Sequence, residues 1–255
     1  MNGSYPDIDS VKKCVLKFVL RQDINDAFDF LVGRLPDKAE IFIVGGAIRN
    51  LIMKKIHGWS PVTADIDLFI TGINSIHSIR KILWQEKITK TALGGIRWFP
   101  EKNDYCFDLC VLSDFIIFRG FNLKPTLDNL ILDIDFNVNS VVFDMKKRDI
   151  YERNCIGSIS DRVIDFNSDL IYDKLITVYR ILLFCEKLRF FLSERIFYYI
   201  KTAVDIDLLI SLKRAYVSNL GKEHSKEILK CYNRICKYKN YEAYRTEEEK
   251  YLTAY

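Results

Sequence analysis

Hydrophobic and polar positions follow two different periods along the first half of the chain. Apolar residues recur at three- and four-residue spacing over residues 8–34, which predicts a helix. A short apolar run at residues 41–44 ends at Gly45-Gly46, and a second helical stretch follows over 47–56. Apolar and polar residues then alternate over residues 65–71, the period of a strand with one buried face. The pattern therefore predicts strands and helices in succession.

The rest of the chain completes an α+β fold. Further elements are expected as a helix over 74–86, strands over 88–99 and 105–112, and a hairpin of 138–145 with 149–151. After about residue 165 the strand pattern stops, and helices are predicted over 169–192, 194–217 and 223–240. We therefore expect a small mixed β-sheet with covering helices, followed by an all-helical C-terminal part. The expected divisions are an N-terminal helical segment, 1–36, a sheet domain, 37–165, and a helical domain, 166–255.

Composition narrows the class of protein. Of the 255 residues, 49% are hydrophobic and 28% charged, as in soluble globular proteins. No apolar run reaches the roughly 18 residues of a membrane helix, and the first twenty residues do not resemble a secretory signal. The seven cysteines form no CxxC pair, and the three histidines are scattered, so we expect reduced thiols rather than zinc. These features predict a cytoplasmic protein with no membrane attachment.

Charge is informative only locally. The net charge of +4 is too small for a general nucleic-acid coat. Between Lys174 and Lys239, however, 14 Lys or Arg residues stand against 6 Asp or Glu residues. This segment is either the solvated outer face of a helical layer or a surface that faces phosphates.

The first candidate for chemistry is the Gly45-Gly46 pair between a predicted strand and a predicted helix. Glycine lets the backbone approach a ligand closely, and a helix N-terminus offers unpaired N–H groups and a positive dipole end to a phosphate. Arg49 lies about one turn into the helix, where it could reach the same phosphate or brace the loop. Tight packing alone would also explain two adjacent glycines.

The second candidate is a set of carboxylates. Asp65 and Asp67 lie two apart on a predicted strand, so they face the same side. Two adjacent carboxylates suit Mg²⁺, which takes one or two protein carboxylates together with water and substrate phosphates. Asp108, in the otherwise apolar strand 105–112, would be a third carboxylate if the strands are neighbours, unless it forms a structural salt bridge. Three carboxylates would fit phosphoryl transfer with a two-ion Mg²⁺ site, which Mn²⁺ could also occupy.

These motifs resemble a known family. Val44-Gly45-Gly46-Ala47-Ile48-Arg49 followed by Asp65-Ile66-Asp67 is similar to the head domain of class II tRNA nucleotidyltransferases (CCA-adding enzymes) and bacterial poly(A) polymerases. That head belongs to the DNA polymerase β-like nucleotidyltransferase superfamily. Asp135-Phe136-Asn137-Val138-Asn139 resembles the family motif whose Asp and Asn place the sugar of the incoming nucleotide. The resemblance covers roughly residues 38–190.

The resemblance implies a role for each motif residue. Asp65, Asp67 and Asp108 would be the catalytic, metal-binding carboxylates, and Gly45, Gly46 and Arg49 would bind the triphosphate. Asp135, Asn139 and Arg180 would line the nucleotide site. The implied substrates are an NTP, ATP or CTP, and an RNA or tRNA acceptor.

Several positions depart from the family pattern. Asn50 stands where Asp is usual, and Asp133 and Ile134 replace two arginines. Thr177 and Leu183 lie where the first neck helix often carries arginines. The base-selecting Glu-Asp-x-x-Arg motif is not found.

Three functions remain open at this stage. The first is a metal-dependent nucleotidyltransferase that moves NMP from an NTP to a hydroxyl, most simply an RNA or tRNA 3′ end, and releases pyrophosphate. The second is a catalytically weakened nucleotide- or RNA-binding module with the same fold. The third is a subunit whose helical half docks a protein partner that supplies acceptor binding.

Overall fold

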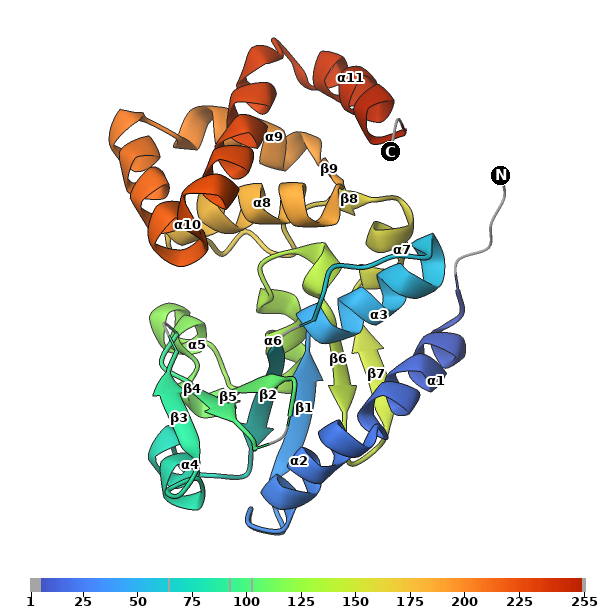
Figure 1. Cartoon of the computed structure of the whole chain (residues 1–255), viewed down its shortest axis with the longest axis vertical. Coiled ribbons are helices and arrows are strands. Elements are labelled where there is room, and N and C mark those ends of the chain that lie inside the picture. The colour runs from blue at the N-terminus through green and yellow to red at the C-terminus, as the bar shows by residue number, and fades with distance from the viewer. Residues whose placement is uncertain (1–5, 64, 92, 102, 254–255) are drawn as a thin grey trace. The chain divides into compact units, whose positions relative to one another are not determined.

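The computed structural model describes residues 6–253 except 64, 92 and 102. The described residues form two compact units, the first within Met1–Ile134 and Val138–Ser160, the second within Asp135–Asn137 and Asp161–Tyr255. The first holds a mixed sheet and the second is mainly helical (Figure 1). The predicted α+β class is confirmed.

The first unit is built on a seven-stranded sheet with the order β3-β4-β5-β2-β1-β6-β7. Its strands are β1 (Glu40–Val44), β2 (Asp65–Thr71), β3 (Lys87–Lys90), β4 (Ile96–Phe99), β5 (Cys106–Val111), β6 (Val141–Asp144) and β7 (Asp149–Glu152). Only the β2–β5 pair is parallel; the other neighbours are antiparallel. The strands that carry the predicted carboxylates are therefore adjacent at the centre of the sheet.

The predicted strand over 88–99 is wrong as one element, because it is a hairpin of β3 and β4. The turn is closed by the Thr91 N–H, which donates to the Gly95 carbonyl at 3.1 Å. Gly94 has a φ of +86°, a conformation that side chains disfavour. β3 contains one apolar residue, Ile88, so the pattern of apolar residues did not separate the two strands.

Two helices, α1 (Ile8–Val19) and α2 (Gln22–Val32), begin the first unit. The single helix predicted over 8–34 is wrong, because Arg21 adopts an extended conformation that separates them. The helical spacing of apolar residues continues through both helices, so it does not reveal the break at Arg21. Phe28 of α2 packs edge-to-face on Phe107 of β5, so α2 covers one face of the sheet (Figure 1).

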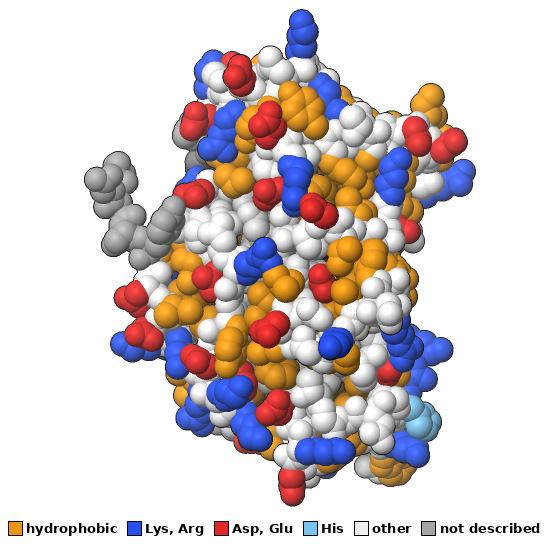
Figure 2. Space-filling model, turned by 180° about the vertical axis from the view of Figure 1, so that it is seen from behind, with side chains coloured by type: hydrophobic (Ala, Val, Ile, Leu, Met, Phe, Trp, Pro, Cys, Tyr) orange, Lys and Arg blue, Asp and Glu red, His pale blue; other side chains and the backbone are white. Residues whose placement is uncertain are grey.

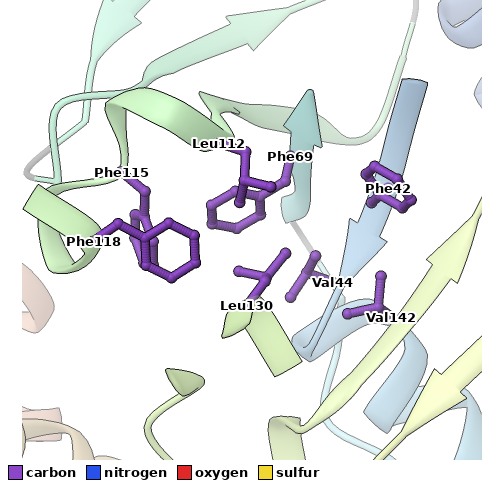
Figure 3. Packing of buried hydrophobic residues seen from close by; sticks show 8 residues of the cluster. All are labelled: Phe42, Val44, Phe69, Leu112, Phe115, Phe118, Leu130 and Val142. Carbon is purple, nitrogen blue, oxygen red and sulfur yellow. The ribbon is translucent and has the colours of Figure 1, made fainter. Parts of the chain in front are cut away.

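The opposite sheet face is covered in part by α5 (Ile116–Phe121) and α6 (Leu127–Asp133), two helices that the sequence pattern did not predict. Figure 3 shows the cluster that buries this area, composed of Phe42, Val44, Phe69, Leu112, Phe115, Phe118, Leu130 and Val142. Leu112 and Phe115 lie around a short 3₁₀ turn that follows β5. The helices are short and their buried positions too few to establish a period.

Three further helices complete this unit: α3 (Gly46–His57), α4 (Ile76–Ile82) and α7 (Cys155–Ser160). The first starts directly after β1, as the Gly45-Gly46 pair predicted, and ends at Gly58 in the left-handed conformation. The second is shorter than the predicted 74–86.

The second unit contains α8 (Lys174–Leu188), α9 (Glu194–Ala203), α10 (Ile206–Lys237), α11 (Tyr241–Thr253) and a two-stranded parallel sheet of β8 (Val163–Ile164) and β9 (Phe191–Leu192). Gly221, with a φ of +79°, divides α10 at a kink. The helices predicted over 194–217 and 223–240 are therefore divided differently, at Val204-Asp205 and Gly221.

The C-terminal tail packs more firmly than expected. The sequence predicts a frayed or peripheral helix over 241–255, but Tyr244 and Glu248 of α11 are buried. The Tyr244 hydroxyl accepts from the Leu192 N–H at 3.0 Å, and Glu248 forms an ion pair with Arg234. Burial raises the pKa of Glu248, while Arg234 opposes that shift. No helix within the described residues is long and apolar enough to cross a membrane.

Candidate active site

One row of paired residues crosses the middle of the sheet at the end of β1. Val44 pairs with Asp67, Asp67 with Asp108, and Asp108 with Arg97. Residues opposite one another on neighbouring strands share a sheet face, so the two carboxylates and Arg97 lie on one side. Asp65, two residues before Asp67, shares this side. We call Asp65, Asp67, Arg97 and Asp108 the charged end of this face.

The glycine bend lies at the same edge. Because Val44 pairs with Asp67, the chain turns at Gly45 directly beside the carboxylates. Gly45 has a φ of +65° and a ψ of −109°, and its N–H donates to the Val141 carbonyl at 2.9 Å. The Gly45 N–H is thus used within the sheet. The N–H groups available to an anion are those of the first turn of α3, starting with the half-buried Gly46.

Arg49 braces this bend from inside. Arg49 is only 3% exposed, and its guanidinium donates to the Asn139 Oδ1 at 2.6 Å and to the Asn50 Oδ1 at 3.0 and 3.1 Å. A Cβ on Gly45 would lie 3.5 Å from the Asn139 carbonyl oxygen. Of the two roles considered for Arg49, these contacts support bracing the loop.

Asn50 extends the brace toward β2. Its Nδ2 donates to the Thr63 Oγ1 at 2.9 Å and to the Pro61 carbonyl at 3.3 Å. An aspartate has no such donor, so the departure from the family pattern matches the contacts made here. Sequence reasoning noted Asn50 only as a departure, and the partners Pro61 and Thr63 could not be predicted from spacing.

Arg97 is the site residue that sequence reasoning missed. Its Nε and Nη2 donate to the two oxygens of Asp108, each at 2.7 Å. The Nη2 also lies 3.6 Å from the Asp65 Oδ2. The bond to Asp108 raises the pKa of Arg97, so the guanidinium stays charged. A signal was available, because Arg97 stands between the apolar Ile96 and Trp98.

The thiol beside this group is neutral at ordinary pH. Cys106 pairs with Asp65 across β2 and β5, and burial raises its pKa above the ordinary 9.0. Farther along β5, burial raises the pKa of Cys110 to about 12. Oxygen donors are therefore the ligands that this face offers at neutral pH.

The side chains on this face suit a divalent ion bound by two carboxylates better than one bound by three. Within the described part of the chain, no group of three or more His, Cys, Asp or Glu side chains is placed to hold a metal ion. Both oxygens of Asp108 are engaged by Arg97. Asp65 and Asp67 share a strand and a face, and the Asp65 side chain is 52% exposed. Two carboxylates plus water and phosphate oxygens satisfy Mg²⁺.

The other predicted nucleotide residues lie in the second unit. Arg180 of α8 forms an ion pair with Asp135 through its Nε, and it also lies over the Phe184 ring at 5.1 Å from the centroid. The Asp135 carbonyl accepts from the Asn167 N–H at 3.1 Å. The structure thus brings Asp135 together with Arg180, and Asn139 together with Gly45 and Arg49.

The basic excess of the helical segment is partly paired. Lys226 and Lys230 form ion pairs with Glu223 and Glu227 one turn earlier in α10. On the face shown in Figure 2, Lys and Arg side chains are interspersed with Asp and Glu. These contacts favour a solvated helical face for this part of α10. The sequence favours core packing over base stacking for the aromatic residues of this segment. Of these, Phe184, Phe190, Phe191 and Phe197 are buried, Tyr199 is half-buried and Tyr198 is exposed.

The same fold occurs in solved structures of tRNA-processing enzymes. A CCA-adding enzyme in complex with ATP superposes with a TM-score of 0.63 and 17% identity, over 88% of this chain and 54% of that one. A Thermotoga maritima CCA-adding enzyme complexed with tRNA gives 0.61 and 16%, over 90% and 54%. A tRNA nucleotidyltransferase with a primer tRNA and an incoming ATP analogue gives 0.56 and 19%, over 77% and 57%.

These matches confirm the predicted resemblance at the level of the fold. The chain spans about half the length of the solved structures that it matches. No protein-family model and no curated protein matches the sequence. The chain therefore shares its fold with those structures at low sequence identity.

Proposed function

We propose that this protein is a nucleotidyltransferase that moves a nucleoside monophosphate from ATP or CTP to a hydroxyl, with an RNA or tRNA 3′ end as acceptor. The observation that carries the proposal is the pairing of Val44 with Asp67, which puts a helix-opening glycine bend beside two carboxylates on one strand. A helix N-terminus suits a phosphate group and carboxylates suit a hard cation, so the two features side by side fit a metal-bound triphosphate. The fold shared with CCA-adding enzymes supports the same activity.

In this proposal the glycine bend and the carboxylates have separate roles in the transfer reaction. The acceptor oxygen forms a bond to the α-phosphorus, the bond to the β-phosphate oxygen breaks, and pyrophosphate leaves. The first N–H groups of α3 bind the phosphate tail, and Arg49 keeps the bend in shape through Asn139. A carboxylate of the charged end accepts the proton of the acceptor hydroxyl, with Asp108 as the predicted base.

Asp65 and Asp67 would hold the divalent cation, Mg²⁺ or Mn²⁺. When bound, that ion supplies charge stabilisation for the phosphates and lowers the pKa of an oxygen ligand. Asp135 and Arg180 are proposed to contact the nucleotide, in keeping with their motif. Asp135→Asn should weaken NTP binding, and Arg195→Gln, which removes another paired arginine of the second unit, should not.

The test is a transfer assay with purified full-length protein, Mg²⁺ and each α-labelled NTP in turn. Each reaction contains total RNA or tRNA that lacks its 3′ end, and product mass gives the number of nucleotides added. We expect labelled RNA and pyrophosphate with the wild type, and neither with Asp65→Asn plus Asp67→Asn. Transfer that persists in the double variant would reject the proposal.

The ion pair of Arg97 with Asp108 favours a second candidate, a nucleotide-binding module with weakened catalysis. Both oxygens of Asp108 already accept hydrogen bonds from Arg97, so an acceptor hydroxyl would have to compete with the guanidinium for them. This candidate predicts saturable ATP or CTP binding without pyrophosphate release. It also predicts no change in NTP affinity in Asp108→Asn. A copurifying protein that restores turnover would instead indicate that a partner supplies acceptor binding.

A further inference from the structure

The charged end of the sheet face contains a positively charged side chain, that of Arg97, beside its carboxylates. Arg97 on β4 donates to both oxygens of Asp108 at 2.7 Å, and its Nη2 lies 3.6 Å from the Asp65 Oδ2. Bidentate pairs of this kind are among the stronger and more directional polar contacts in proteins. The Arg97 side chain is 39% exposed and that of Asp108 is 18% exposed. The pair is therefore partly screened from solvent on the carboxylate side.

Strand register explains why the pair forms. Arg97 and Asp108 are directly opposite on antiparallel strands, and Asp108 is directly opposite Asp67. Opposite residues on one sheet face are close enough for their side chains to meet. The contact is thus determined by pairing of β4 with β5, not by a flexible loop.

Charge balance points in the same direction. By formal charge, this group sets three carboxylates, those of Asp65, Asp67 and Asp108, against the single guanidinium of Arg97. The remaining charge of −2 is what a single divalent cation neutralises. A second divalent ion on Asp108 would have to displace Arg97 or lie against its positive charge, which is unfavourable at short range.

We infer that Arg97 is a positioning residue that occupies Asp108 as an internal cation, so that the resting site takes its divalent ion on Asp65 and Asp67 alone. This inference rests on the proposed function, because it concerns the metal site of that reaction. Asp108 becomes a metal ligand only when Arg97 is removed or moves away. The arginine thereby limits the number of carboxylates that the free enzyme offers to a metal.

The test is a cycle of four full-length proteins titrated with Mn²⁺ alone, with free Mn²⁺ measured by electron paramagnetic resonance. The proteins are the wild type, Arg97→Gln, Asp108→Asn and the double variant. If Arg97 acts only through its positive charge, Arg97→Gln should tighten Mn²⁺ binding. The loss of Mn²⁺ affinity caused by Asp108→Asn should then be the same with and without Arg97. The coupling between the two substitutions separates this charge effect from release of a ligand.

We expect Asp108→Asn to weaken Mn²⁺ binding about tenfold in the Arg97→Gln background and by less than about threefold in the wild type. An equal or larger loss in the wild type would overturn the inference, because Asp108 would then already be a ligand. Arg195→Gln removes an arginine of similar exposure that pairs with Asp169 and Asp165, and it should leave Mn²⁺ affinity unchanged. If Arg97→Gln does not fold, Arg97→Lys replaces it in the same cycle, because lysine cannot form the bidentate fork.

Failure of the proposed function gives a different result. If the variant with Asp65→Asn and Asp67→Asn binds Mn²⁺ as the wild type does, the assignment of the metal site to these two carboxylates is wrong. If that double variant loses Mn²⁺ while the Arg97 and Asp108 substitutions show no coupling, only the role of Arg97 is wrong.

Discussion

Asp67 and Phe69 lie two residues apart on β2 and face the same side of the sheet, yet their surroundings are opposite. Phe69 packs edge-to-face on Phe115 within the cluster under α5 and α6 (Figure 3). Asp67 lies beside the glycine bend and opposite Asp108. The covered end of this face buries apolar area, which stabilises the fold. The charged end places like charges together, which opposes folding unless cations balance them.

The comparison indicates how one sheet face serves two purposes. The cluster around Phe69 holds β1, β2 and β5 in place, and this positions the carboxylates without requiring favourable contacts among them. We therefore expect substitutions at the charged end to affect activity and those at the covered end to affect stability. Four substitutions, ordered from the largest expected effect to the smallest, test this division.

Asp67→Asn should abolish most activity and leave stability almost unchanged. Loss of a metal-binding carboxylate removes transition-state charge stabilisation, and we expect a fall of about 10³-fold in the rate of transfer. Removing one of three neighbouring negative charges should not lower the free energy of unfolding. Transfer assays and urea denaturation measure the two effects. A large loss of stability with activity retained would reverse the assignment of this end.

Phe69→Ala should cost about 3 kcal/mol of unfolding free energy, because it opens a cavity between β2 and the helices. The loss is measured by urea denaturation. Asp67→Ala is the matched control on the same strand and face, and it should cost far less. Equal costs for the two substitutions would show that the two ends do not differ in their contribution to stability.

Gly45→Ala should destabilise the protein by about 1–2 kcal/mol, because an L-residue is strained at this positive φ. Gly58→Ala is the matched control, since Gly58 also has a positive φ and a Cβ there would meet no atom within 4 Å. Gly45→Ala should lose more stability than Gly58→Ala in thermal unfolding, because the φ of +65° and ψ of −109° at Gly45 lie outside the left-handed region that Gly58 occupies. Only Gly45→Ala should weaken ATP binding, measured by calorimetry, because only that bend presents the first turn of α3. Equal ATP affinity in the two variants would separate the bend from the phosphate site.

Asp133→Asn should stabilise the protein slightly at neutral pH. Asp133 ends α6 and is 9% exposed, and burial raises its pKa above the ordinary 3.8. A raised carboxyl pKa favours folding below the ordinary value, and that contribution is lost as pH rises through the raised pKa. The variant should therefore gain less than about 1 kcal/mol at pH 7.

That gain should shrink as pH falls, because protonation of the wild-type carboxyl removes the buried charge. Thermal unfolding of both proteins between pH 4 and 8 measures the difference. A gain that is constant across this range would show that the charge of Asp133 is not its cause.

Much of the site was predictable because its chemistry lies in short local motifs. The Gly45-Gly46 bend and the alternation around Asp65 and Asp67 are visible in a few consecutive residues, and the structure has the helix and strand there. Asp108 was predicted to lie on a strand, and the condition that this strand neighbours the one with Asp65 and Asp67 is met in the sheet. Local period and residue type were sufficient for these features.

Other features depended on partners distant in sequence. The break at Arg21 leaves the apolar period intact, and β3 has too few apolar residues to show a period of its own, so the pattern predicted longer elements. The tail helix appeared peripheral because its sequence is polar, yet Tyr244 reaches the Leu192 N–H. A few buried residues anchor such a segment, and their contacts cannot be predicted from their neighbours in the chain.

By itself, the sequence determined the α+β class, the glycine bend before a helix and the pair of aspartates on one strand, because each depends on residues a few positions apart. Only the tertiary structure decided which charges meet. Strand order and register put Arg97 onto Asp108 and placed Asn139 against Arg49, across 90 residues of chain in the second case. Electrostatic interactions depend on distance in space, and folding sets that distance through packing contacts elsewhere in the sheet.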